Sequence, residues 1–176
     1  MKNECRVACK LWVESSEFVF AFHFKRRKLQ GNTSERKFMN QSIIYLLEQH
    51  NLRKTAMRAR VLEIFLHHRE ALSHNDIESQ FDQVDRITLY RTLKTFEDKG
   101  LIHKAIDGSE KAKYALCNSG CDEHEHHDHH AHFHCDDCGK TYCLDTIEAP
   151  AISAPLGFQV AETYLVVKGK CEACAN

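Results

Sequence analysis

Residues 85–101 read DRITLYRTLKTFEDKGL, and this stretch has the pattern of an amphipathic helix. Leu89, Leu93 and Phe96 recur at helical spacing, so they form one apolar face, while the charged residues lie elsewhere. Gly100 stands where a helix-terminating glycine belongs. The stretch therefore predicts a helix that packs on one side and presents a polar surface on the other.

The residues on either side extend this helix into a larger arrangement. Upstream, NQSIIYLLEQHN and LRKTAMRARVLEIFLHH have helical spacing, and Thr55 is a suitable N-cap for the second. SHNDIESQF begins with Ser73, and Asp76 three residues later completes a capping box. Downstream, the β-like runs LIHKAI and KYAL flank DGSEKA, which indicates a hairpin turn. The last three of these helices, followed by a hairpin, predict a winged helix-turn-helix domain over residues 39–116.

The rest of the chain has a different character. Residues 117–131 are rich in His and acidic residues and predict a hinge. The later runs HFHC, KTYCLD and GFQVAETYLVV are strand-like, so we expect a small α/β domain over residues 132–176. The predicted fold class is therefore α+β with two domains. Residues 1–38 are polar, basic and aperiodic, and we interpret them as a disordered extension or as sequence upstream of a translation start at Met39.

Charge and cysteine usage differ between the two halves. Residues 1–116 carry 21 Lys and Arg against 15 Asp and Glu, whereas residues 117–176 carry 3 against 10. A basic half suits a polyanion such as DNA, and an acidic half with seven of the nine cysteines suits cations. No apolar stretch approaches the ~20 residues of a membrane helix, and no secretory signal is evident. We therefore expect a cytoplasmic protein without a membrane partner, in which paired cysteines favour metal over disulfides.

The clearest chemical motif is a pair of Cys-x-x-Cys sequences, Cys135 with Cys138 and Cys171 with Cys174. Each pair brings two sulfurs to one side of a tight turn, so the two pairs can supply the four thiolates of a tetrahedral structural zinc site. Because 32 residues separate the pairs, the zinc would join the two ends of the small domain. The alternative is four reduced thiols without metal.

The helix of residues 85–101 is the candidate for DNA recognition. By itself an amphipathic helix would more often be a solvated surface helix, but its position as the third helix before a hairpin favours DNA. A recognition helix lies in the major groove, where some side chains contact bases and lysines contact phosphates. The candidate contacts are Thr88, Tyr90, Arg91 and Lys94 on this helix, Lys54 and Arg58 upstream, and Lys111 and Lys113 on the hairpin.

TLYRTLKTFEDKGLIHK, KYALC, HAHFHCDDCGK and CEAC occur in this order, and over about residues 40–176 the chain resembles the ferric uptake regulator family. LRKTAMRARVLEIF is similar to the helix that opens that family's DNA-binding domain. The resemblance implies a homodimeric, metal-dependent winged-helix repressor, whose C-terminal domain dimerises and whose regulatory metal lies at the hinge. It also implies that Tyr90 and Arg91 contact bases.

The resemblance further implies a ligand set for the regulatory metal. Family members carry two His three and five residues before the first structural Cys, which here are His132 and His130. Since residues two apart on a strand face the same side, both imidazoles can reach one metal. The remaining candidates are Cys143 and Cys117, with Cys121, His127 and Glu148 as outer possibilities. Alternatively, Cys143 packs as a small buried hydrophobe, and His127 only raises the local metal concentration.

Two departures from the family pattern bear on the metal. The His that iron- and peroxide-sensing members carry before the third helix is Ala71 here, and His74 is displaced by three residues. The acid and the His of the family's auxiliary site are Ala131 and Thr163. Together with the additional cysteines, these changes favour a mixed nitrogen and sulfur site, which suits Zn(II) better than Fe(II) or Mn(II).

We therefore predict a zinc-responsive repressor of zinc uptake genes that binds a palindromic double-stranded DNA operator as a homodimer. It would hold one structural Zn(II) and one regulatory divalent metal, also Zn(II). The alternatives are an iron-, manganese- or peroxide-responsive regulator on the same scaffold, a zinc-buffering protein, or a zinc enzyme. An enzyme is disfavoured because no His-Glu-x-x-His occurs and neither Cys135 nor Cys171 follows a proline.

Overall fold

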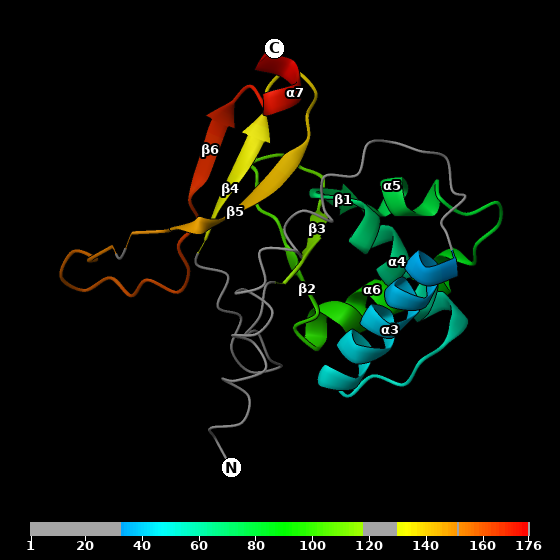
Figure 1. Ribbon diagram of the computed structural model, residues 1–176. Helices are drawn as coiled ribbons and strands as arrows, with labels where there is room; N and C mark the ends of the chain where they lie inside the picture. The colour runs from blue at the N-terminus through cyan, green and yellow to red at the C-terminus, as the bar shows by residue number, and fades with distance from the viewer. Residues whose placement is uncertain (1–32, 118–129, 151, 176) are drawn as a thin grey trace. The chain divides into compact units, whose positions relative to one another are not determined.

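The computed structural model describes residues 33–117, 130–150 and 152–175 (Figure 1). The chain divides into two compact units, Met1–Asn40 and Gln41–Asn176, and the elements discussed below belong to the second unit, apart from the start of the first helix. Among the described residues, no helix is long and apolar enough to cross a membrane.

Four helices form the N-terminal part of the described chain, and local capping explains where three of them begin. They are α3 (Thr33–Gln49), α4 (Ala56–His67), α5 (His74–Glu78) and α6 (Arg86–Asp98). The Thr55 hydroxyl caps α4, the Asp85 carboxylate caps α6, and Ser73 forms a full capping box with Asp76 at α5. These caps satisfy amide groups that a helix leaves without intrahelical partners. The predicted N-caps at Thr55 and Ser73 are confirmed.

Helix α6 ends in a Schellman motif centred on Gly100. This glycine has φ 67°, a left-handed conformation that residues with a Cβ adopt at a cost. The Gly100 N–H donates to the Glu97 carbonyl at 3.0 Å, and the Leu101 N–H donates to the Phe96 carbonyl at 2.9 Å. The predicted helix stop at Gly100 is confirmed, and it turns the chain into the next strand.

Six strands form one sheet in the order β2-β3-β1-β5-β4-β6. Strands β1 (Glu70–Ser73), β2 (Ile102–Lys104) and β3 (Lys113–Leu116) lie among or after the helices, and β2 and β3 make the predicted hairpin. Strands β4 (His130–Cys135), β5 (Thr141–Glu148) and β6 (Val166–Gly169) precede the short helix α7 (Glu172–Ala175). Strand β1 pairs with both β3 and β5, so the two groups of strands are continuous.

Helices α4, α5 and α6 share an apolar core. Val61, Leu62, Ile77, Leu89 and Phe96 are fully buried there, and each removes apolar surface from water. The expected apolar face of α6 is therefore confirmed. A smaller cluster of buried alanines lies where the strands meet; its members are Ala71, Ala105 and Ala115.

Three expectations about secondary structure need correction. The run GFQVAETYLVV was expected to be a strand, but only residues from Val166 onward pair in the sheet. A strand needs a neighbour's backbone groups, and in the described chain residues 157–164 form no ladder pairing, whereas the Leu165 carbonyl accepts from the His132 N–H at 2.9 Å. Strand β1 was not expected, and helix α3 begins at Thr33 rather than near residue 40.

Candidate metal centres and DNA-binding helix

Four cysteines converge where β4 and β6 end. Strand β4 ends at Cys135, a tight turn leads to Cys138, and Cys171 and Cys174 lie at helix α7. One sulfur from each cysteine lies within 4.8 Å of all the others. The Gly139 N–H closes the turn on the Cys135 carbonyl at 2.9 Å, and Gly139 has φ 68°. The two Cys-x-x-Cys sequences thus meet as their spacing predicted.

The sulfur atoms of this group have a spacing that suits zinc. A tetrahedron with Zn–S bonds of about 2.3 Å has S–S edges of about 3.8 Å. The distance between the Cys138 and Cys171 sulfurs is 3.8 Å. Backbone N–H groups from Cys138 and Cys171 lower the pKa of Cys135 to about 6, so this sulfur readily becomes the thiolate that binds metal. The group could hold a structural zinc.

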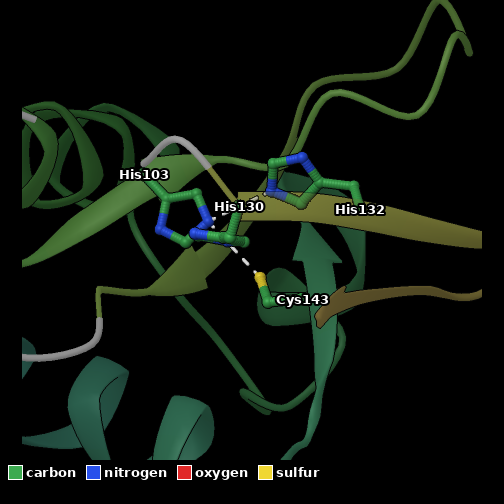
Figure 2. Close-up of side chains that lie close together, drawn as sticks. All are labelled: His103, His130, His132 and Cys143. Carbon is green, nitrogen blue, oxygen red and sulfur yellow. Dashed lines mark hydrogen bonds between the residues drawn. The ribbon is translucent and has the colours of Figure 1, made fainter. Parts of the chain in front are cut away.

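A second group joins His103 from β2 with three side chains from the C-terminal strands. Figure 2 shows His103, His130, His132 and Cys143 pointing toward one another. The Nε2 atoms of His103 and His132 lie 3.3 Å apart, and His103 Nε2 lies 3.4 Å from the Cys143 sulfur. One ligand atom from each of the four residues lies within 4.8 Å of the others. This arrangement brings together three nitrogens and one sulfur.

The second group also passes a test for metal fit. A tetrahedral zinc site with Zn–N bonds of about 2.0 to 2.1 Å and a Zn–S bond of about 2.3 Å has N–N edges of about 3.3 Å and N–S edges of about 3.6 Å. The two measured distances match these edges closely. His103 and His132 are buried, and burial followed by the neighbouring His130 imidazole lowers the pKa of His132 to about 4. His132 is therefore neutral at pH 7, which is the form that binds metal.

The surroundings of His103 support the same interpretation. The Nδ1 atom of His103 lies 3.6 Å from the Cys117 sulfur. A ligating His commonly uses its second ring nitrogen for such an outer contact, which fixes the orientation of the ring.

Not every predicted ligand joins the second group. Cys117 contacts the outer nitrogen of His103 rather than the four-atom group, so its predicted role as a direct ligand is not what the geometry favours. Glu148 is exposed and pairs with His130 only through the backbone ladder. Cys121 and His127 lie outside the described residues.

Sequence reasoning missed His103. It lies in the predicted hairpin strand LIHK, far along the chain from the other members of the group. The usable signal was a histidine in a strand that otherwise carries core residues. That signal is weak, because an isolated buried histidine is also a common packing residue.

Helix α6 presents its polar side to solvent. Tyr90 is 61% exposed, and Arg91 and Lys94 are exposed as well. The Lys94 ammonium lies 2.8 Å from the Asp98 carboxylate, one turn further along the same helix. Thr88 is also exposed, although its hydroxyl donates to the Asp85 cap. The helix therefore offers an aromatic and two cationic side chains on an accessible surface.

The remaining predicted DNA contacts differ in their surroundings. Lys54 and Lys111 are exposed, and the Arg58 guanidinium donates to the Arg53 carbonyl at 2.8 Å. Lys113 needs correction, because its side chain is only 13% exposed and lies 2.7 Å from the buried Asp107 carboxylate. An interior ion pair of this kind makes Lys113 a poor candidate for a phosphate contact.

Comparisons with known proteins agree with this geometry. The model of the "Ferric uptake regulator family" matches residues 49–165. The chain belongs to the ferric uptake regulator family. It is therefore a metal-responsive transcription regulator and not an enzyme; family members are DNA-binding proteins that bind metal.

Relatives in this family carry different names. The chain is 32% identical over 137 residues to a ferric uptake regulation protein of Staphylococcus epidermidis, covering 74% of this chain and 92% of the relative. It is 26% identical over 141 residues to the peroxide operon regulator of Bacillus subtilis, covering 74% and 89%. These relatives support membership of the family, but they do not identify the metal that this chain binds.

Solved structures support the fold. A zinc uptake regulator complexed with zinc and DNA aligns with a TM-score of 0.56 at 24% identity, covering 82% of this chain and 97% of that one. A structure described as holo XcZur aligns with a TM-score of 0.54 at 22% identity, covering 79% and 97%. At these identities the likeness establishes a shared fold only.

Proposed function

We propose that this member of the ferric uptake regulator family is a zinc-responsive repressor of zinc uptake genes. The single observation that carries the proposal is the group of three imidazoles and one thiol, two of whose members are buried and whose spacing matches tetrahedral zinc. Borderline-soft Zn(II) accepts mixed nitrogen and sulfur ligands, whereas Mn(II) prefers oxygen ligands and Fe(II) sensors commonly include carboxylates. No carboxylate belongs to this group among the described residues.

The two candidate metal groups would have separate tasks. Zinc at Cys135, Cys138, Cys171 and Cys174 would hold β4, β6 and α7 together as a structural centre. Zinc at His103, His130, His132 and Cys143 would be the regulatory ion, since this group joins the hairpin to the C-terminal strands. A metal that binds one arrangement of these elements better than another shifts the population toward that arrangement.

Recognition of DNA would use the winged helix-turn-helix formed by α4, α5, α6 and the hairpin. Tyr90 and Arg91 are exposed on α6 and are proposed to contact bases, while Lys94 contacts phosphate. Thr88, Lys54, Arg58 and Lys111 remain candidates for further contacts. Lys113 is left out because its ammonium is held by Asp107.

A homodimer is part of the proposal. Residues 152–164 carry large apolar side chains that are exposed in the single chain, with Leu156 fully exposed and Phe158 72% exposed. An exposed apolar patch of this kind commonly marks a protein interface. A symmetric dimer would place two copies of α6 on a palindromic operator.

The proposal is tested by metal-dependent DNA binding. A duplex selected from a random library by the zinc-loaded protein serves as the probe, and its affinity is measured anaerobically with Zn(II), Fe(II) or Mn(II). We expect tight binding with Zn(II), loss of binding with a chelator that removes only the weaker zinc, and weak binding with the other metals. Equal or better binding with Fe(II) or Mn(II) would favour an iron or manganese sensor instead.

A zinc-buffering protein makes a different prediction. It would not need the exposed face of α6, so Tyr90→Ala and Arg91→Ala would leave both zinc binding and the cellular response to zinc unchanged. The regulator predicts that the same variants keep zinc and lose repression.

A further inference from the structure

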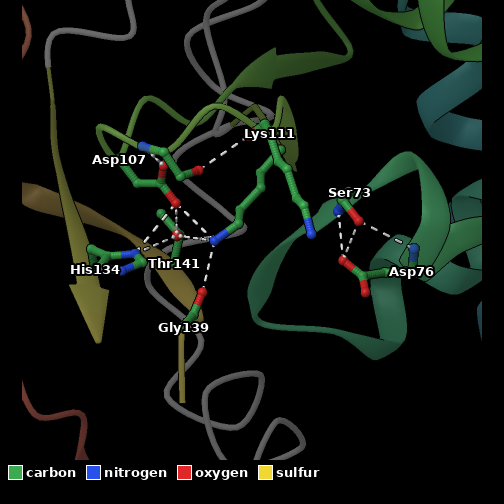
Figure 3. A network of polar contacts seen from close by, with 9 residues as sticks. Ser73, Asp76, Asp107, Lys111, His134, Gly139 and Thr141 are labelled. Atoms are coloured by element: carbon green, nitrogen blue, oxygen red, sulfur yellow. Dashed lines mark hydrogen bonds and ion pairs between the residues drawn. The ribbon is translucent and has the colours of Figure 1, made fainter. Parts of the chain in front are cut away.

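The turn of the hairpin holds a buried carboxylate. The Asp107 side chain is only 1% exposed, and its two oxygens face four groups. The Ser109 N–H donates to Oδ1 at 2.8 Å, and the Thr141 hydroxyl donates to Oδ2 at 2.5 Å. The Lys113 ammonium lies 2.7 Å and His134 Nδ1 lies 3.3 Å from Oδ2. Figure 3 shows the His134 and Thr141 side chains beside Asp107.

Two of the four partners come from outside the hairpin, and both stand beside the proposed regulatory ligands. His134 follows His132 by two residues on β4, and Thr141 precedes Cys143 by two residues on β5. Residues two apart on a strand face the same side. The strand faces that carry regulatory ligands therefore also carry the partners of Asp107.

Lys113 extends the network to the structural cysteines. Its ammonium donates to the Gly139 carbonyl at 2.7 Å and to the Thr141 hydroxyl at 3.0 Å. Gly139 lies in the turn that follows Cys138. The hairpin is thus attached to the C-terminal strands by side chains of its own, independently of any bound metal.

Because the Asp107 carboxylate is buried, the hairpin can lie against β4 and β5 only when that carboxylate has partners there. A carboxylate buried without partners would carry a large desolvation cost. When the hairpin lies against β4 and β5, Thr141, His134 and Lys113 compensate that cost, and His103 from the same hairpin lies next to His132. If the hairpin moves away, Asp107 loses Thr141 and His134, and His103 leaves the ligand group.

We propose that Asp107 is a positioning residue that holds the hairpin on β4 and β5 and so presents His103 to the other three regulatory ligands. The inference rests on the proposed function for its effect on zinc. Apparent affinity falls in proportion to the fraction of molecules that are competent to bind. Asp107 therefore raises zinc affinity at the regulatory group without touching the ion.

The variants that test this role are chosen to keep the fold. Asp107→Asn retains the shape of the side chain and removes its charge. Thr141→Val removes only the hydroxyl that donates to Asp107, and it serves as a second variant if the first does not fold. Glu110→Gln is the matched control, because it removes one negative charge from an exposed position three residues along the same turn.

The first readout needs no regulatory metal. In the protein that keeps only the tighter zinc, we expect Asp107→Asn and Thr141→Val to speed amide hydrogen exchange in residues 105–113 and 141–143, while the amides of α4 and α6 keep their protection. Glu110→Gln is expected to match the wild type. A merely structural role would instead raise exchange throughout the unit, and unchanged exchange at both segments would overturn the inference.

The second readout is zinc affinity without DNA. Competition with a chromophoric chelator should show two zinc ions per wild-type chain. We expect Asp107→Asn to weaken the weaker of the two sites on the order of tenfold, within the usual range for coupling between sites, and to leave the tighter site unchanged. Equal affinity in Asp107→Asn and Glu110→Gln would overturn the inference. A wild-type chain that binds only one zinc would overturn the proposed function, while the exchange comparison still decides the role of Asp107.

Discussion

The Nε2 atoms of His103 and His132 lie 3.3 Å apart, although 29 residues separate them in the chain. Two buried imidazoles at this distance cannot both be protonated without strong repulsion. At least one nitrogen must therefore present a lone pair toward the other, as metal ligands do. The contact links the hairpin that follows α6 with the strand that carries the His130–His132 pair.

Replacement of His103 by alanine is expected to abolish the regulatory response. His103→Ala should lower zinc affinity at the weaker site by more than the roughly 10- to 100-fold lost when a residue that only orients a ligand is removed. The tighter zinc at the four cysteines should stay. Zinc content and chelator competition measure both sites, and His67→Ala, an exposed histidine at the end of α4, is the control. Retention of two tight zinc ions in His103→Ala would show that His103 is not a ligand.

Much of the local structure could be predicted because it depends on neighbours along the chain. The capping box at Ser73 and the helix stop at Gly100 follow from spacings of a few residues. His130 and His132 join one group, although the ladder is irregular between His130 and Ala131. The four cysteines could also be grouped, because two Cys-x-x-Cys sequences are typical of a zinc site.

The remainder depends on contacts that no local pattern reports. His103 lies next to Cys143, 40 residues further along the chain. Strand β1 pairs with β5, so one sheet joins the two parts of the chain that were expected to form separate domains. Lys113 was expected to lie on a basic surface, but its ammonium forms an ion pair with the buried Asp107 carboxylate. In each case tertiary placement decided the role of a residue whose type alone allowed several.

Loss of one structural cysteine should be more damaging than loss of the regulatory one. In Cys138→Ser the sulfur that lies 3.8 Å from Cys171 is removed, so the tight zinc should be lost and the ends of β4 and β6 should separate. Circular dichroism and size-exclusion chromatography should report loss of sheet and of the dimer. Cys143→Ser is the matched comparison, and it should keep the sheet and one zinc. Equal losses in the two variants would contradict the division into structural and regulatory centres.

The exposed face of α6 should control DNA affinity without affecting zinc. Arg91→Ala is expected to cost about 1–3 kcal/mol of operator binding and to relax base preference at one position, as for a direct base contact. Lys94→Gln should instead weaken all sequences alike and reduce the salt slope by about 0.9. Fluorescence anisotropy at several salt concentrations measures both effects. Arg69→Ala, which changes an exposed arginine outside α6, is the control, and an equal effect there would argue against α6 as the reading helix.

The left-handed conformation of Gly100 predicts a stability effect. Gly100→Ala should lower the free energy of unfolding by about 1–2 kcal/mol, because a Cβ is disfavoured at φ 67°. Gly100→Asn should lose less, since Asn tolerates this conformation better. Urea denaturation of the zinc-loaded protein gives both values. An alanine variant as stable as the wild type would show that the Schellman turn after α6 can relax at no cost.

Asp107 predicts how stability depends on acid. Burial alone would raise its pKa, but the hydrogen bonds from Lys113, Ser109 and Thr141 outweigh burial and hold the pKa well below the ordinary value of 3.8. A carboxyl whose pKa is lowered in the folded state stabilises the fold above its unfolded pKa, and that contribution is lost as the pH falls below this value. His134 and Lys113 also face this carboxylate. Without metal at the regulatory group, Asp107→Asn should therefore be less stable than the wild type at pH 6, and the difference should shrink as the pH falls below about 4. Urea midpoints of the two proteins and of Glu110→Gln across this range measure the effect, and a difference that does not change with pH would mean that Asp107 stabilises the hairpin by shape rather than by charge.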